Sequence, residues 1–294
     1  MTTSTLALRQ QIESAHDIRS VVQTMKALSA SSIGQYEASV HALDDYFRTV
    51  SLGLVASLRE QGGWASQTAE TADATGIHSL VAVVFGSDQG LAGQFNERIV
   101  AFAHRYLAAH QGELHLWAVG ERVEGRLQDL GFTVRGRFDV PAGVRAVGPL
   151  VGHLLLANEH LLTDDESTEL RLFHNRPATG SVFEPMQQRL LPIDQDWLAT
   201  LMETPWPTNQ LPEVIGAGQV TLRALLREYL FVSLFRACVE SLASENASRL
   251  AAMQRADRNI EELLEQLQTS YHRRRQGSID AELFDLIASF EALD

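Results

Sequence analysis

The sequence has no proline near either end, and it is also poor in cysteine and lysine. All eight prolines lie between Pro141 and Pro212, and Cys238 and Lys26 are the single cysteine and single lysine among 294 residues. Because proline interrupts a helix beyond its first turn, both ends are free to form long helices. A helix from 219 to about 276 would be on the order of 85 Å long at 1.5 Å per residue. A compact body of this size cannot bury such a rod, so the pattern predicts a component of an assembly.

The scarce residues exclude several kinds of site. A lone cysteine permits no internal disulfide bond and no cysteine-based metal site, and we expect Cys238 to be a small apolar side chain on a helix. The ten histidines are scattered along the chain rather than spaced as metal ligands. The net charge of −13, with one dense basic cluster at 273–275, argues against a nucleic-acid partner.

Long hydrophobic runs are also missing. The run at 80–85 is far shorter than the ~20 residues that cross a bilayer, and the first twenty residues lack the apolar core of a signal peptide. With 45% hydrophobic and 21% charged residues, the chain can bury a sizeable core. We therefore expect a cytosolic protein without membrane insertion.

Both ends of the chain carry apolar residues at helical spacing. In segment 1–60 these residues recur alternately four and three positions apart, which is typical of a coiled-coil seam. The clearest part of this seam is Tyr36, Val40, Leu43, Phe47, Val50, Leu54 and Leu58. Segment 213–294 has a similar apolar stripe. Because each end offers one stripe, the simplest packing is a long antiparallel coiled coil of N- and C-terminal helices.

Some positions depart from the seam. The small residues at 29–34 predict a close helix contact or a slight bend, and Gly34 costs a helix roughly 1 kcal/mol relative to alanine. Asn246, Arg249 and Asp257 interrupt the stripe of the second helix. These interruptions indicate that some polar positions face another protein.

The middle segment, 76–200, has a different pattern. Short apolar runs alternate with helical stretches, which predicts an α/β fold with a small Rossmann-like domain and a mostly parallel sheet. The expected strands are 80–85, 114–119, 132–140, 170–175 and 182–192, and the expected helices are 96–109, 121–130 and 148–162. Glycines after Gln61 and a Pro/Gly-rich stretch from Pro205 to Gly218 predict linkers on either side.

One segment, GSDQGLAGQFN from Gly86 to Asn96, is a candidate for a phosphate-binding turn because it joins a strand to a helix. Its glycines match neither the dinucleotide spacing nor the P-loop, and no Lys-Ser or Lys-Thr follows. A tight turn that needs small residues for close packing is the favoured interpretation. Ser87 and Asp88 have no candidate base nearby in the sequence. The sequence therefore predicts no active site, no metal and no cofactor.

Three segments carry a resemblance to a known family. They are LRQQIESAHDIRSVVQTMKALSAS near the start, GSDQGLAGQFN in the middle, and ASENASRLAAMQRADRNIEELLEQLQTSYHRRRQGSIDAEL near the end. In order and spacing they resemble the gamma subunit of rotary F-type ATP synthases. The resemblance spans nearly the whole chain, and the last segment is the most specific.

The resemblance implies a central stalk. In that family the terminal helices form a coiled coil inside a ring of three catalytic and three non-catalytic subunits, the alpha3beta3 ring. The α/β domain forms a foot on the membrane rotor ring, beside the epsilon stalk subunit. It implies a peripheral location at the cytoplasmic face of the bacterial inner membrane. The stalk performs no chemistry, and the ATPase activity belongs to the partner subunits.

The resemblance also assigns partner-contact residues. Met25 and Lys26 match the methionine motif of the first helix, and Glu245 and Arg249 match a polar pair of the second. Arg275 and Gln276 match a pair that family members use against a loop of a catalytic subunit. An arginine suits this role because its planar guanidinium grips a carboxylate with two parallel hydrogen bonds.

The sequence departs from the family pattern at several positions. Ser31, Ser32 and Gly34 occupy a stretch that is usually basic, and Gln254 and Asp280 replace a basic residue and a threonine. These departures suggest a divergent branch, such as the gamma subunit of an alternative, sodium-linked bacterial ATPase. Two alternatives stay open: a nucleotide- or small-molecule-binding α/β protein with coiled-coil assembly arms, and a scaffold with gamma architecture that does not rotate.

Overall fold

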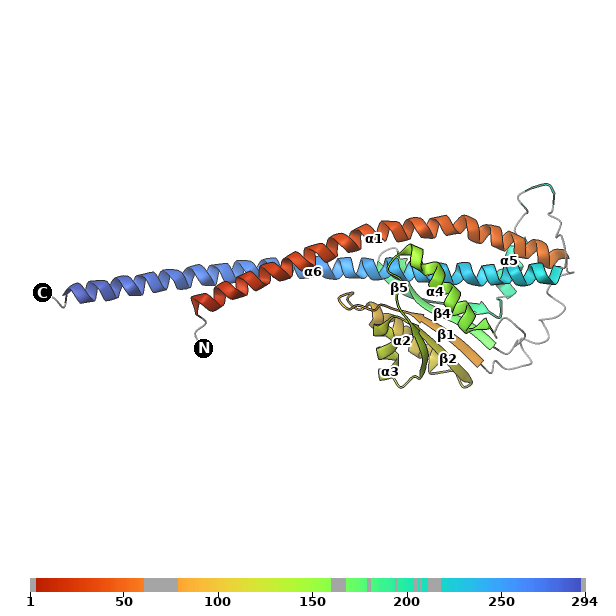
Figure 1. Ribbon diagram of the computed structural model, residues 1–294, viewed down its shortest axis with the longest axis horizontal. Helices are drawn as coiled ribbons and strands as arrows, with labels where there is room; N and C mark the ends of the chain where they lie inside the picture. The colour runs from red at the N-terminus through yellow and green to blue at the C-terminus, as the bar shows by residue number, and fades with distance from the viewer. Residues whose placement is uncertain are drawn as a thin grey trace. The chain divides into compact units, whose positions relative to one another are not determined.

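The computed structural model describes residues 4–60, 79–159, 168–178, 181–193, 195–203, 206, 208–210 and 218–291. The chain divides into two compact units. The first unit combines Met1–Ser29 with Arg249–Asp294, and the second unit is Ala30–Ser248. Helix α1 (Thr5–Glu60) and helix α6 (Gly218–Glu291) each contribute residues to both units (Figure 1). The long terminal helices predicted from the proline-free ends are therefore confirmed.

In the first unit, α1 and α6 pair along a seam with a seven-residue repeat. The buried residues of this part of α1 follow one another at intervals of seven: Leu8, Ala15, Val22 and Ser29. On α6, Met253 and Leu264 are buried. Arg19 pairs with Glu261 and Lys26 pairs with Asp257, so the two helices run in opposite directions. The predicted antiparallel coiled coil is confirmed here.

The same antiparallel pairing holds within the second unit. The guanidinium of Arg236 on α6 lies 3.2 Å from the carboxylate of Asp44 on α1. Two residues further along α1, the hydroxyl of Tyr46 donates a hydrogen bond to Glu228 at 2.7 Å. Residue numbers therefore increase along α1 while those of their partners on α6 decrease. The two helices are antiparallel here, as they are in the first unit.

The second unit also contains a five-stranded sheet in the order β3-β2-β1-β4-β5. Its strands are β1 (Ser79–Phe85), β2 (Glu113–Val119), β3 (Val134–Phe138), β4 (Thr168–Ala178) and β5 (Ser181–Leu191). Neighbouring strands from β3 to β4 are parallel, and β5 is antiparallel to β4. The mostly parallel sheet of the sequence prediction is confirmed.

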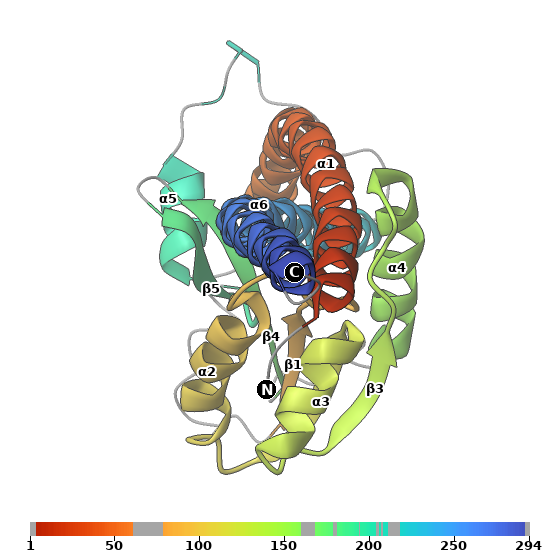
Figure 2. The same cartoon turned by 90° about the vertical axis from the view of Figure 1, so that its left-hand side faces the viewer.

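Helices cover both faces of the sheet, as the central strand β1 illustrates. One face packs on α4 (Val144–Ala157) and on the second-unit parts of α1 and α6, through Val81, Val83 and Phe85. The other face packs on α2 (Phe95–Leu107) and α3 (Glu121–Asp129), through Leu80, Ala82 and Val84. Figure 2 shows the sheet between these two groups of helices. Because both faces are covered, the strand reads as a continuous apolar run.

Two helices differ from the sequence prediction. Helix α4 begins at Val144 rather than near Gly148, and it accommodates Pro149. Helix α5 (Gln195–Glu203) was not predicted at all. It forms because Leu198 packs in a small apolar cluster with the nearby Ile193 and with Leu58, which is distant in the sequence. The linkers predicted after Gln61 and before α6 lie largely outside the described residues.

The close contact expected around Gly34 is absent at the glycine itself. A methyl group at this position would meet no atom within 4 Å among the described residues, and α1 continues without a break from 29 to 34. Ser29 is the small residue of this stretch that the seam buries. Gly34 is therefore not required by packing.

Candidate functional site

The first unit contains a network of charges within its apolar seam. Asp257 on α6 accepts hydrogen bonds from Nε of Arg19 at 3.2 Å and from Nζ of Lys26 at 2.8 Å, both on α1. Arg19 also donates to Glu261 at 2.9 Å. The hydrogen bond from Lys26, with that from Arg19, lowers the pKa of Asp257 against the opposing effect of desolvation. One carboxylate thus links two cations that lie two helical turns apart.

Asp257 is one of the polar interruptions of the apolar stripe on α6, some of which were expected to face another protein. Its carboxylate is bound within the chain. The same holds for Asn246, whose side-chain amide donates to the carbonyl of Leu242 on its own helix at 2.9 Å. Arg19 lies 238 positions before Asp257, so sequence spacing alone does not reveal that the two meet.

Two exposed apolar stripes lie on the helices of the first unit. On α1, Ile18, Val21 and Leu28 are 56%, 59% and 64% exposed, and they alternate with the buried seam. On α6, every described side chain beyond Tyr271 is exposed, including Ile279, Leu283, Phe284 and Ile287. Apolar side chains gathered on one face in this way are typical of surfaces that another protein covers. The sequence contains a signal for the exposed stripe on α1, because its residues form a second set of apolar positions spaced three or four apart.

The predicted partner-contact residues occupy three separate places. Met25 and Lys26 are half-buried neighbours on α1, and Arg249 is half-buried on α6 in the same unit. Arg275 and Gln276 are exposed on α6, about 40 Å along the helix from Arg249 at 1.5 Å per residue. Glu245 is buried and belongs to the second unit. They are arranged as positions along rods rather than as one pocket.

The turn at 86–96 is held by its own polar groups. The carboxylate of Asp88 accepts hydrogen bonds from the backbone N–H groups of Glu121, at 2.9 Å, and Val140, at 2.8 Å. The side chain of Asn96 accepts from the backbone of Ser87 and donates to its hydroxyl. An anionic side chain of this turn thus lies at the N-terminus of α3, where the helix dipole favours negative charge.

Glycine at position 86 is explained by close packing. A Cβ atom there would lie 2.5 Å from the Cβ of Val123 on α3. Such a distance is too short for two carbon atoms, so a larger residue would push α3 away from the turn. The interpretation of this segment as a tight turn that needs small residues is therefore confirmed at Gly86.

A chain of charges, from the buried His174 to the exposed Asp44, joins three elements of the second unit. Nε2 of His174 on β4 lies 2.9 Å from the carboxylate of Glu240 on α6, which also accepts from Arg236 at 2.9 Å. Arg236 in turn pairs with Asp44 on α1. Burial raises the pKa of Glu240, but hydrogen bonds and charge from His174 and Arg236 outweigh it, so the net pKa is lowered. This chain of charges fixes the helix pair to the sheet.

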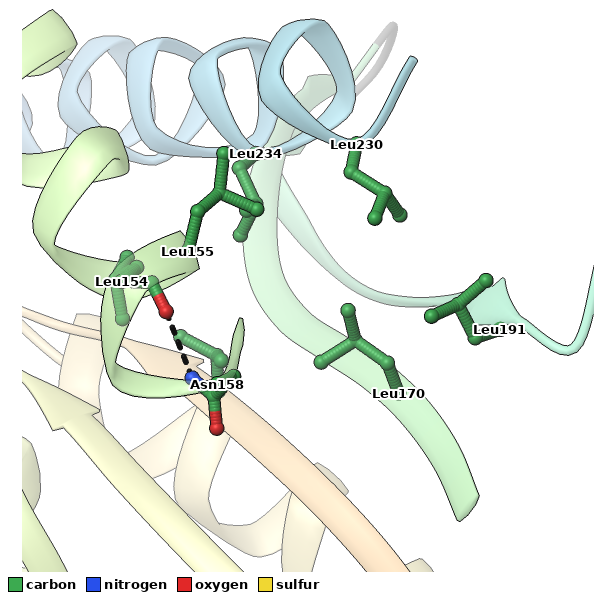
Figure 3. A pocket seen from close by; sticks show the side chains of 8 residues that line it. Leu154, Leu155, Asn158, Leu170, Leu191, Leu230 and Leu234 are labelled. Carbon is green, nitrogen blue, oxygen red and sulfur yellow. Dashed lines mark hydrogen bonds between the residues drawn. The ribbon is translucent and has the colours of Figure 1, made fainter. Parts of the chain in front are cut away.

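One pocket of the second unit offers little room to a small ligand. The pocket between α4, α6 and the sheet has a volume of about 10 Å³, room for roughly one water molecule. Figure 3 shows leucines from α4, α6, β4 and β5 around it, with Asn158 bonded to the carbonyl of Leu154. No metal-ligand cluster occurs in the described part of the chain. Burial raises the pKa of the Cys238 thiol, so this thiol is an unreactive side chain of the core.

Comparison with known proteins decides the family. A family model described as ATP synthase matches residues 4–293. Similar proteins include the ATP synthase gamma chain of Leifsonia xyli subsp. xyli, which is 27% identical over 97% of this chain and 96% of the relative. The chain belongs to the gamma-subunit family of F-type ATP synthases.

Solved structures support the fold of this gamma-family chain. The rotor of the Euglena gracilis mitochondrial ATP synthase contains a similar chain, with a TM-score of 0.64 and 14% identity over 94% of this chain and 98% of that one. The central stalk and c-ring structure from Tetrahymena thermophila gives a TM-score of 0.57 and 20% identity over 80% of this chain and 99% of that one. In the gamma-family chain described here, no helix among the described residues is both long and apolar enough to span a membrane.

Proposed function

We propose that this chain is the central-stalk, or rotor-shaft, subunit of an F-type ATP synthase or ATPase. It couples rotation of a membrane ring to ATP synthesis or hydrolysis in surrounding subunits. The observation that carries the proposal is the pair of single helices, 56 and 74 residues long, joined by an antiparallel seam in a gamma-family chain. Exposed apolar stripes on the first unit supply surfaces for the surrounding subunits.

The stalk acts through contacts that differ from one orientation to the next. A partner shifts the conformations of a protein only by binding them with different free energies. The first unit is chemically uneven around its axis: α1 carries the stripe at Ile18, Val21 and Leu28, and α6 carries the charged surface at 272–276. Each orientation therefore offers different contacts to each surrounding site. The network around Asp257 keeps the two helices in one register during this motion.

The proposed partners follow from the family. The first unit contacts the catalytic and non-catalytic subunits of the alpha3beta3 ring, and ATP is hydrolysed in those subunits, not in the stalk. The α/β part of the second unit contacts the membrane rotor ring and the epsilon subunit. The complex lies peripherally at the cytoplasmic face of the bacterial inner membrane. The names of the similar structures, rotor and central stalk with c-ring, support this arrangement.

The contact residues are proposed individually. Arg275 and Gln276 contact a catalytic subunit directly because both are exposed on α6. Met25 lies beside the exposed stripe of α1 and extends it. Lys26 acts mainly through its hydrogen bond to Asp257, which holds the helix pair in register. Glu245 and Arg249, both on α6, are the remaining proposed contact residues.

The experiment is purification of the complex from the native organism through an affinity tag on this chain. We expect a nucleotide-hydrolysing hexamer to copurify and its ATP hydrolysis to drive ion transport in membrane vesicles. Recovery of the chain without the hexamer would overturn the proposal. A hexamer whose hydrolysis drives no transport would favour the non-rotating scaffold instead. Dependence of the hydrolysis rate on sodium would test whether the chain belongs to the sodium-linked branch.

A further inference from the structure

A groove lies on the α/β part of the second unit, and none of the residues that line it has been discussed above. It runs between the outer face of α2 and the edge strand β5, and its lining is Arg98, Ala101, Phe102, Arg105 and Pro185. The α2 residues follow the three-and-four spacing of one helix face. Figure 2 shows α2 near the β5 side of the sheet. The groove has an apolar floor with an arginine at each end of the helix face.

Aromatic rings, rather than carboxylates, hold the two arginines. The guanidinium of Arg98 lies 4.6 Å from the ring centre of Phe183, and that of Arg105 lies 5.3 Å from the ring centre of Phe102. A cation over an aromatic face is attracted by the ring but keeps its charge and its N–H donors. These contacts position both cations without neutralising them.

The two groove arginines differ in this respect from several other arginines of the second unit. Nearby arginines are paired with carboxylates: Arg126 with Glu97, Arg137 with Glu124 and Arg176 with Glu184. Within the described ranges, neither Arg98 nor Arg105 has a carboxylate within 4 Å. A chain with a net charge of −13 has many acidic residues available, yet it leaves these two cations uncompensated. Their charge is complementary to an acidic partner.

The floor of the groove is rigid. Phe102 packs edge-on against the buried Phe173, with ring centres 6.5 Å apart, and Tyr106 packs on the same ring at 5.9 Å. The hydroxyl of Tyr106 donates to Glu169, whose carboxylate also binds Arg171. Rings fixed in this way lose little further side-chain entropy when a partner binds.

Resting on the proposed stalk function, we propose that this groove docks an acidic segment of a neighbouring subunit, with two carboxylates on either side of an apolar side chain. Arg98 and Arg105 are seven residues apart on a helix, about 10 Å along its axis. A single phosphate reaches only one of them, whereas two carboxylates of a protein segment span the distance. Pro185 lacks a backbone N–H, so strand addition along β5 is disfavoured and the segment lies across the side chains.

The test is photo-crosslinking from the groove in the assembled complex. p-Benzoylphenylalanine replaces the exposed Ala101 in the tagged full-length chain, and the complex is purified, irradiated and analysed by mass spectrometry. We expect a crosslink to a partner-subunit peptide with two acidic residues around an apolar one. We also expect at least a tenfold loss of crosslinked product in the Arg98→Glu/Arg105→Glu variant, and weaker crosslinking at high salt.

The matched control is Arg122→Glu/Arg145→Glu, which makes the same change in net charge at two other exposed arginines. It should leave the crosslink yield unchanged. A complex that assembles without the crosslink, a crosslink to lipid, a crosslink to a non-acidic peptide, or equal losses in both variants would each overturn the inference. Failure of the hexamer to copurify would instead overturn the proposed stalk function and the inference with it.

Discussion

At the scale of single residues, buried charges are placed where one element must hold another. Glu240 lies between His174 on the sheet and Arg236 on its own helix, and the three groups compensate one another. Burial alone would favour the neutral carboxyl group, so the lowered pKa of Glu240 reports how strongly its partners favour the charged form. The link between helix pair and sheet therefore depends on one ionised carboxylate.

Replacing Glu240→Gln tests this link. We expect the free energy of unfolding at neutral pH to fall by about 2 kcal/mol, because the buried His174 and the partly exposed Arg236 lose their charged acceptor. The folded pKa of Glu240 lies below its ordinary value of 4.5, so its contribution is present above that pH and is lost as the pH falls through the folded pKa. The difference between wild type and variant in urea unfolding should shrink on acidification. A difference independent of pH would contradict this role.

A second residue-scale prediction concerns glycine. Gly86→Ala should lower the free energy of unfolding by about 1–3 kcal/mol, because the new methyl group would collide with Val123. Gly125→Ala is the control: it lies in α3, and a methyl group there meets no atom within 4 Å among the described residues. That variant should be stabilised by about 0.5–1 kcal/mol. Urea unfolding of both variants checks the opposite signs.

At the scale of elements, the first part of α1 has two different apolar faces. One face forms the seam with α6, through residues such as Val22, which is 7% exposed. The other face is exposed and includes the preceding residue, Val21, which is 59% exposed. Stability of the helix pair and binding of surrounding subunits are thus assigned to neighbouring positions on one helix.

This pair of valines allows a matched comparison. Val22→Asp should lower the free energy of unfolding by at least about 2 kcal/mol, since it places an unpaired charge in the seam. Val21→Asp should change it by less than about 0.5 kcal/mol but reduce the amount of hexamer that copurifies with the chain. If Val21→Asp leaves the complex intact, the exposed stripe is not a contact surface.

Some of the elements could be predicted from the sequence, and others could not. The seam of α1 and the runs of β1 were predictable because their spacing is set by neighbours along the chain. Helix α5 was not, because its Leu198 packs in a cluster with Leu58, which is distant in the sequence. The pairing of Arg19 with Asp257 was not either, since it joins residues on two separate helices. For the site, the family resemblance suggested Arg275, Gln276 and Lys26, but only the structure shows that the first two are exposed and that Lys26 is bound within the chain.

At the scale of the whole molecule, the chain combines two long helices with a packed α/β domain. The function of such a protein depends on the partners that its surfaces contact. The residues proposed for partner contact are spread along α1 and α6, in contrast to the convergent side chains of an active site.

The pair Arg275 and Gln276 gives the prediction at this scale. In the assembled complex, Arg275→Ala/Gln276→Ala should reduce the rate of ATP-driven ion transport about tenfold, because hydrogen bonds to a charged partner contribute roughly 1.5–3 kcal/mol. Unfolding of the isolated chain should not change, since both side chains are exposed. Arg273→Ala, also exposed on the same helix, is the control and should transport ions normally. Equal losses in both variants would remove the special role of the pair.

The buried thiol of Cys238 has a practical consequence. It is 1% exposed and is the chain's single sulfhydryl, so maleimide reagents will not react with the native protein. A cysteine introduced at an exposed position such as 273 would become the sole attachment point on this chain. A gold rod or a fluorophore fixed there would report, one molecule at a time, whether the helix pair turns in steps.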